Sequence, residues 1–287
     1  MSKNKKKIAV TGANGYLGRH VAQYLYDNGY DVYAVDIKND TLPKKMKYIE
    51  KDILRYNENI FEELECPDVL IHLVWRDVFN HNSRYQMGNI SAHFDFVYNM
   101  LKGGLKNFST MGSMHEIGYW EGCIDENTPC NPLSQYGIVK NTLRLSFQEM
   151  ISREFKDVSF KWLRGYYNHG DDEGGNSIFS KLLRADEEGK ELFPFTSGKN
   201  KYDFLDIREV SEQIVAASLQ TEINGVINCC SGKPISLGEM VEAFIREKGL
   251  KIKLDYGKFP DRPYDSPVVY GDNTKIAKIM EKFKNEQ

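Results

Sequence analysis

Three glycines spaced three residues apart lie near the start of the chain, between a short apolar run and a helical pattern. Residues 8–11 are predicted to form a buried strand, and Gly12, Gly15 and Gly18 follow directly. Residues 16–28 then have apolar side chains at helical spacing and end at an Asn-Gly pair, which is typical of a helix C-terminus. A strand, a tight glycine turn and a helix in this order leave free N–H groups at the helix N-terminus. The pattern predicts a pyrophosphate-binding turn whose other members are Asn14, Tyr16 and Leu17. A plain helix-capping loop is the alternative.

The first half of the chain continues this alternation of strands and helices. Strands are predicted at residues 31–35, 47–50, 69–74, 105–111 and 158–163, and helices at residues 90–101 and 136–152. Such βαβ units form a parallel sheet with helices on both faces. We therefore expect an α/β fold, a Rossmann doubly wound parallel sheet, with ligands bound beyond the carboxyl ends of the strands.

The pattern becomes looser after about residue 164, where further helices are predicted at residues 177–188 and 237–248. We expect a dinucleotide-binding domain over residues 1–164, to which residues 202–230 return. Residues 165–287 are expected to form a smaller, interleaved α/β lobe that binds substrate.

Composition excludes several classes of protein. The 287 residues carry 38 basic and 41 acidic side chains, so nothing indicates a nucleic-acid partner. No stretch reaches the roughly 20 apolar residues of a membrane span, and the start of the chain has no signal-peptide pattern. Five cysteines without CxxC or zinc spacing fit reduced thiols in a cytoplasm and no metal site.

Acidic residues follow the second and third predicted strands. Asp36 ends the second strand, 18 positions after Gly18, where a carboxylate binds both ribose hydroxyls of NAD. The same charge repels the 2′-phosphate of NADP, although nearby Lys38 leaves NADP open. Asp52, with the adjoining Ile53, is expected either to contact the adenine amino group or to cap the next segment.

Tyr136 and Lys140 lie four residues apart at the start of a predicted helix, and so share one face of it. A lysine beside a tyrosine favours the phenolate and lowers the tyrosine pKa, which makes the pair a general acid and base. Tyr98 and Lys102 have the same spacing but close an earlier helix, where Lys102 serves as a C-terminal cation. We therefore expect only the Tyr136 pair to be catalytic.

Longer motifs extend these observations over nearly the whole chain. Residues 11–18, 125–129, 131–132, 134–140, 202–207, 225–228, 231–232, 262–265 and 271–275 occur in the order found in one family. The chain resembles the extended short-chain dehydrogenases/reductases, which are NDP-sugar epimerases, dehydratases and ketoreductases. The likeness implies a nucleotide-diphosphate sugar as partner and NAD as cofactor.

The resemblance also implies roles for individual residues. Ser113 matches the residue that hydrogen-bonds the sugar oxygen being oxidised or reduced, while Ser109 and Thr110 are expected to be structural. Tyr136 would exchange a proton with the C4 oxygen, and Lys140 would tune Tyr136 and hold the nicotinamide ribose. Leu73 and Val74 would line the dinucleotide groove, and Arg262 would contact the substrate diphosphate.

Departures from the family pattern gather where the sugar would bind. Ile117 replaces a usual tyrosine, so His115 or Glu116 is expected to contact substrate instead. Met114 and His115 occupy the positions of the dehydratase Asp-Glu pair, and methionine transfers no proton, which disfavours a 4,6-dehydratase.

The remaining departures concern the second lobe and the end of the fourth strand. Tyr167 and His169 stand where the family has Asn and Tyr, and Tyr202 replaces an arginine for which Lys201 could substitute. Trp75 is bulkier than the usual residue, and would shape a sugar pocket or cap the lobe interface.

Three functions remain open from the sequence. The first is reduction of an NDP-4-keto-6-deoxy-hexose for surface polysaccharide synthesis, and the second is a UDP-sugar 4-epimerase that retains NAD. The third is a nucleotide-sensing regulator without catalysis, which the intact set of Ser113, Tyr136 and Lys140 disfavours. A homodimer is expected by resemblance, through the helices near Phe94, Val97 and Leu143.

Overall fold

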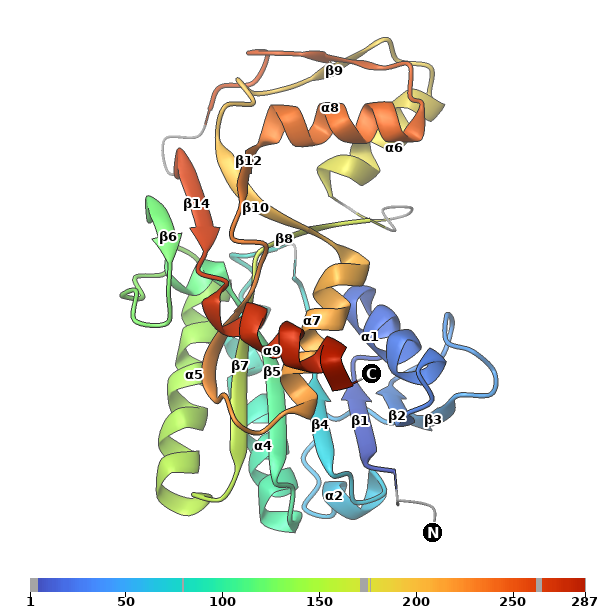
Figure 1. Ribbon diagram of the computed structural model, residues 1–287, viewed down its shortest axis with the longest axis vertical. Helices are drawn as coiled ribbons and strands as arrows, with labels where there is room; N and C mark the ends of the chain where they lie inside the picture. Colours follow the sequence, from blue (N-terminus) through green and yellow to red (C-terminus); the bar gives the residue numbers. More distant parts are fainter. Residues whose placement is uncertain (1–4, 79, 171–174, 176, 262–264, 287) are drawn as a thin grey trace.

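The computed structural model describes residues 5–78, 80–170, 175, 177–261 and 265–286. Its large sheet has seven strands in the order β11-β7-β5-β4-β1-β2-β3, and neighbouring strands run parallel throughout (Figure 1). The strands are β1 (Lys7–Thr11), β2 (Asp31–Asp36), β3 (Lys47–Glu50), β4 (Val69–His72), β5 (Asn107–Ser113), β7 (Ser159–Gly165) and β11 (Gly225–Cys229). This arrangement confirms the expected doubly wound α/β fold.

Two sets of helices cover the two faces of this sheet. One face carries α1 (Tyr16–Asp27), α7 (Ile207–Leu219) and α9 (Thr274–Glu286), which pack on one another. The other carries α2 (Ile60–Glu63), α4 (Ile90–Gly103) and α5 (Gln135–Glu154), with α3 (Tyr85–Gly88) beside α4 and α5. Because both faces are covered, β4 and β5 are buried along their whole length, as a central parallel strand requires.

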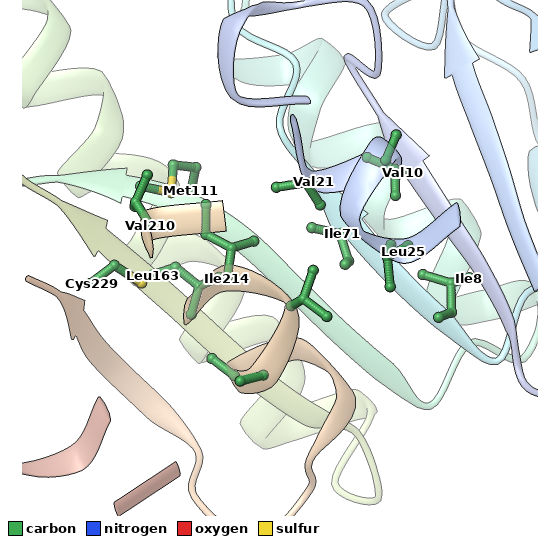
Figure 2. Close-up of a cluster of buried hydrophobic side chains, with 14 of the residues drawn as sticks. Ile8, Val10, Val21, Leu25, Ile71, Met111, Leu163, Val210, Ile214 and Cys229 are labelled. Atoms are coloured by element: carbon green, nitrogen blue, oxygen red, sulfur yellow. The ribbon is translucent and has the colours of Figure 1, made fainter. Parts of the chain in front are cut away.

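The core beneath α1 and α7 shows how the sheet acquires its helices. Figure 2 shows Val21 and Leu25 of α1 beside Ile71 of β4, with Ile214 of α7 above the neighbouring strands. These side chains recur at helical spacing along α1 and α7, so each helix offers one apolar face to the sheet. Their packing fixes the start of α1 at the carboxyl end of β1.

A smaller lobe lies above the carboxyl ends of the large sheet (Figure 1). Its main sheet has the order β12-β10-β14-β6, with β8 on β10, and β13 pairs with β9. Phe179, Leu182, Phe195, Val241 and Phe244 form its core. The elements are β6 (Gly122–Ile124), β8 (Tyr167–His169), α6 (Ile178–Glu187), β9 (Leu192–Pro194), β10 (Lys201–Asp206), β12 (Pro234–Ser236), α8 (Leu237–Lys248), β13 (Lys253–Asp255) and β14 (Val268–Gly271).

The chain crosses between the lobes more often than the sequence indicates. β6 comes from the first 164 residues but pairs with β14 in the small sheet. In the opposite sense, α9 comes from the C-terminus but packs on α7 and β11 of the large sheet. The apolar face of α9, formed by Ile276, Ile279 and Phe283, joins the large core, which is why this segment does not stay with the small lobe.

Two further observations concern absences among the described residues. No helix in these ranges is long and apolar enough to cross a membrane. The same ranges contain no cluster of three or more His, Cys, Asp or Glu side chains that could hold a metal ion.

Candidate active site

The glycine turn joins β1 to α1 at the point where the strand order of the large sheet reverses. Gly12 has a φ of +73°, and a Cβ there would lie 2.8 Å from the backbone N of Val74. A Cβ on Gly18 would collide with the Gly12 carbonyl oxygen. The N-cap Gly15 has no side chain to cap α1, so no cap side chain competes with a ligand at this helix N-terminus. The turn therefore fits a pyrophosphate, and Leu73 and Val74 border it.

Asp36 and Asn14 brace this turn from the end of β2. The Asp36 carboxylate accepts hydrogen bonds from the backbone N of Asn14 at 2.8 Å and of Ile37 at 2.7 Å. The Asn14 side-chain oxygen accepts from the N and Oγ1 of Thr41, at 3.0 and 2.6 Å. Asp36 thus lies beside the turn, where a ribose would follow the pyrophosphate, while the Asn14 side chain fixes the loop rather than pointing to a ligand.

Asp52 and Ile53, which follow β3, both have partners within the protein. The Asp52 carboxylate accepts from Nη2 of Arg76 at 3.2 and 3.3 Å and from the backbone N of Leu54 at 3.2 Å. Asp52 therefore caps its own turn and holds a cation from the loop after β4. The Ile53 side chain is buried in the hydrophobic core, and its expected contact with the cofactor stays a prediction.

The structure brings together Ser113, Tyr136 and Lys140. Ser113 ends β5, whereas the other two lie on the first turns of α5, which begins after a Ser134 N-cap. The Ser113 hydroxyl is hydrogen-bonded to the Tyr136 phenol, and the Lys140 ammonium donates to the Met111 carbonyl oxygen at 2.7 Å. All three are buried at the carboxyl end of the sheet. As expected from the sequence, Ser109 and Thr110 instead donate hydrogen bonds to backbone carbonyls of β4.

The ionisation of this pair differs from the sequence expectation. Burial raises the pKa of Tyr136 to about 12, although the Ser113 hydrogen bond opposes this. Burial also lowers the pKa of Lys140 to about 7, opposed by the charge of Glu116. The prediction of a lowered tyrosine pKa is therefore wrong for the protein alone, because desolvation of both charged forms outweighs their attraction. The phenol is protonated near neutral pH.

Glu116 lies beneath the site and does not reach substrate. Its carboxylate is fully buried and accepts from the backbone N of Ser113 at 2.6 Å and from Nε1 of Trp162 at 2.9 Å. Arg164 and Arg144 approach the same carboxylate at 3.6 and 3.7 Å. The expectation that Glu116 binds substrate is wrong, because all of its acceptor capacity is used inside the protein to anchor Ser113.

Two histidines surround the Tyr136 ring. His81, from the loop after β4, stacks on the phenol ring with centroids 4.9 Å apart and an interplanar angle of 15°. His115 meets His81 edge-on at 4.5 Å, and burial lowers the pKa of both imidazoles. His115 also meets the Tyr136 ring edge-on at 6.1 Å, and its expected contact with substrate stays a prediction. His81 has no motif in the sequence, since only the folding of its loop brings it to Tyr136.

Trp75 lies against Tyr136 and Lys140. The Lys140 ammonium lies 3.5 Å from the centroid of the indole, and the Tyr136 ring meets the indole edge-on at 5.7 Å. His93 of α4 stacks on the indole at 4.9 Å. Trp75 therefore contacts both Tyr136 and Lys140, and neither role that the sequence suggests for it includes this contact.

A buried chain of polar groups runs from the glycine turn to α4. The Thr11 hydroxyl is 2.7 Å from Nδ1 of His72, whose Nε2 is 2.9 Å from Nδ1 of His93. Burial lowers the pKa of His72 to about 3 and that of His93 well below its usual value. Both imidazoles are therefore neutral, and they link β1, β4 and α4 behind the site. The sequence gives no signal for either, because each is a lone histidine in an apolar segment.

The small lobe contributes the other predicted residues. Tyr167 packs on Tyr202, with ring centroids 4.7 Å apart, and the Lys201 side chain is exposed. The Tyr16 hydroxyl donates to the Gly170 carbonyl oxygen at 2.6 Å, so the helix after the glycine turn is tied to the end of β8. Arg262 lies outside the described residues.

The sequence of this chain matches a known protein family. The sequence model of the "NAD dependent epimerase/dehydratase family" matches residues 8–230. A dTDP-6-deoxy-L-talose 4-dehydrogenase (NAD(+)) of Aggregatibacter actinomycetemcomitans is 42% identical over 271 residues, which cover 92% of this chain and 98% of that protein.

More distant relatives also match over nearly the whole length of this chain. A UDP-glucose 4-epimerase of Bacillus subtilis is 25% identical, over 95% of this chain and 91% of its own length. The solved structure of a UDP-glucose-4-epimerase from Stenotrophomonas maltophila, with bound NAD and formylated UDP-arabinopyranose, superimposes with a TM-score of 0.84. That alignment covers 96% of this chain and 92% of the other at 16% identity, so it shows a shared fold.

Proposed function

Since the chain belongs to the NAD-dependent epimerase/dehydratase family, we propose that it is an NAD-dependent oxidoreductase acting at C4 of a nucleotide-diphosphate sugar. Its favoured reaction is reduction of a 4-keto-6-deoxy sugar nucleotide. The relative with 42% identity is named for the reverse chemistry, oxidation at C4 of a 6-deoxy sugar. The observation that carries the proposal is the buried Ser113–Tyr136–Lys140 set at the carboxyl edge of the sheet, the edge at which the glycine turn also lies.

The residues of this chain at the carboxyl ends of β1 and β2 fit NAD. The N-terminus of α1, where Gly15 provides no side-chain cap, suits its pyrophosphate, and the Asp36 carboxylate suits a ribose without a 2′-phosphate. NAD, when bound, supplies the acceptor or donor of hydride. Binding of NADP is still to be measured, because the cation of Lys38, which pairs with Asp40, is only two residues from Asp36.

Ser113 and Tyr136 perform the proton chemistry at the C4 oxygen. Reduction of a carbonyl needs one proton as well as hydride, and the buried phenol of Tyr136 carries that proton because burial raises its pKa to about 12. The Ser113 hydroxyl, held through its backbone by Glu116, orients the carbonyl oxygen toward the phenol. The protonated phenol is the form that donates when a 4-keto sugar is reduced.

A UDP-sugar 4-epimerase is the alternative, favoured by the relatives with 25% identity. An epimerase uses the same three residues but keeps its cofactor bound and regenerates it. The two reactions differ in whether free NADH is consumed, which gives a direct test.

The test uses purified protein under anaerobic conditions. A spectrum of the protein as isolated shows whether nicotinamide is retained, and NADH absorbance is then followed with a dTDP-4-keto-6-deoxy-hexose. Stoichiometric loss of NADH supports the reductase. Retained NAD, no net NADH loss and interconversion of UDP-glucose with UDP-galactose would instead support the epimerase.

We also propose a homodimer formed through α5, in a protein that works in the cytoplasm. Phe94, Val97 and Leu143 do not support it, since Val97 and Leu143 lie in the core and Phe94 packs against it. The exposed apolar residues of α5 are instead Ile138 and Leu145, two turns apart on one face. A Leu145→Glu variant should elute as a monomer on size-exclusion chromatography with light scattering if α5 forms the dimer.

A further inference from the structure

The Lys140 ammonium has few partners for a buried charge. Only 4% of the residue is exposed, and its hydrogen-bond partner among the described residues is the Met111 carbonyl oxygen at 2.7 Å. An ammonium has three N–H donors, and a charge removed from water is costly unless other groups replace its hydration. The face of Trp75, with its centroid 3.5 Å from Nζ, lies in the place of a second partner.

The other groups around Lys140 do not replace this contact. Glu116, from the 3₁₀ turn after β5, acts on Lys140 through its charge but spends its oxygens on Ser113, Trp162 and two arginines. His72 of β4 and His93 of α4 also lie within electrostatic reach, and burial keeps both neutral. Tyr136, on the same helix, is protonated near neutral pH. The indole therefore offers the closest negative potential after the Met111 carbonyl.

Trp75 is held in this orientation by contacts from separate elements. Its Nε1 donates to Oε1 of Gln86 at 2.9 Å, and Gln86 is fully buried, with its own amide bonded to the Asp77 carbonyl at 2.8 Å. The His93 ring stacks on the indole at an angle of 16°. A side chain fixed on two sides presents its face to Lys140 persistently, so the contact is a built feature of the site.

We propose that Trp75 is a positioning residue for the Tyr136–Lys140 pair, whose indole face keeps the buried Lys140 ammonium charged and in place. The inference deepens the proposed function, because Lys140 is the residue expected to hold the nicotinamide ribose and to act on Tyr136. It predicts that weakening the π face allows Lys140 to lose its proton at lower pH, without moving any group that touches the sugar.

Fluorinated tryptophan tests this without changing the shape of the side chain. Fluorine withdraws electron density from the indole face and weakens a cation–π contact stepwise. The intact protein, labelled with mono-, di- and trifluorotryptophan, is titrated with NADH by calorimetry from pH 6 to pH 10. We expect the pH above which NADH affinity declines to fall progressively with fluorine number. In Trp75→Leu, which removes the face, it should fall by about one pH unit.

Trp75→Phe provides the matched control. Labelling this variant places fluorine only on Trp120 and Trp162, and Trp162 bonds to Glu116 rather than to Lys140. Fluorine number should then have no effect. If fluorination leaves the decline of NADH affinity where it is in the wild type, or displaces it equally in Trp75→Phe, the proposal is wrong. Sugar turnover is measured separately, so a protein that binds NADH but reduces no 4-keto sugar overturns the proposed function alone.

Discussion

Replacing Glu116 by Gln should destabilise the protein and lower kcat while leaving KM for the sugar nucleotide nearly unchanged. The carboxylate accepts from the backbone N of Ser113 and from Trp162, and it is the anion facing Arg144 and Arg164. The substitution keeps the shape of the side chain but removes its charge and turns one acceptor into a donor.

The magnitude follows from these contacts. Gln has one acceptor oxygen, so if it serves Ser113, its NH2 group faces the Trp162 N–H and the guanidinium groups, which are also donors. Removing one partner from a buried ionic cluster costs about 3–5 kcal/mol, a large fraction of the roughly 5–15 kcal/mol by which a protein is stable. A displacement of Ser113 by about 1 Å would reduce kcat by about 100-fold.

Urea unfolding followed by circular dichroism measures the first effect, and steady-state kinetics the second. Glu149→Gln is the matched control, because Glu149 pairs with Arg153 on the exposed side of α5. If Glu116→Gln unfolds at the same urea concentration as this control and instead raises KM about tenfold, Glu116 contacts the substrate and does not anchor Ser113.

Four other changes have equally definite outcomes. Because burial lowers the folded-state pKa of His72 to about 3 and of His115 to about 4, the unfolded chain binds more protons below pH 6.5. The contribution of these histidines to the free energy of unfolding is therefore fully present above pH 6.5. It is lost as pH falls, by up to about 1.4 kcal/mol per pH unit for each histidine, which unfolding titrations at several pH values measure. Asp36→Ser should lower the ratio of kcat/KM for NADH to that for NADPH by at least about tenfold in steady-state assays, and an unchanged ratio would remove Asp36 from the ribose site. Gly18→Ala should abolish NADH binding in calorimetry, since its Cβ has no room in the glycine turn. Tyr136→Phe should lower kcat by about 10²–10⁴-fold with NADH affinity retained, and turnover within a few-fold of wild type would exclude Tyr136 as the acid.

The elements of the large sheet can be predicted closely because their signals are local. The third strand, expected at residues 47–50, is β3 (Lys47–Glu50), and the helix expected at residues 237–248 in the small lobe is α8 (Leu237–Lys248). The positions of β6 and α9 cannot be predicted in this way. β6 is placed by pairing with β14, which is more than a hundred residues away in sequence. α9 is placed by packing on α7 and β11, across the lobe boundary.

The same division holds for the site. Gly12, Gly15, Gly18, Tyr136 and Lys140 can be found because their spacing along one turn or one helix is itself the signal. Their ionisation cannot, since burial decides the pKa of Tyr136 and no local pattern reports it.

Residues that act through tertiary contacts leave no motif. Trp75 contacts Lys140, and His81 contacts Tyr136, only after the loop that follows β4 has folded against α5. His93 of α4 then stacks on Trp75. The prediction for Glu116 is wrong for the same reason, because its position beside Ser113 in sequence says nothing about the direction of its side chain.

The most direct test of net C4 reduction is the fate of a deuterium label. Purified protein is incubated with a dTDP-4-keto-6-deoxy-hexose and NADH carrying deuterium at both hydrogen positions of the nicotinamide C4, and the sugar is analysed by NMR. The account predicts one deuterium at C4 of the sugar for each NADH oxidised, with none transferred by Tyr136→Phe on the same timescale. Turnover of the sugar nucleotide with no label at C4 and no loss of free NADH would contradict it, and would identify an enzyme that regenerates its own bound cofactor.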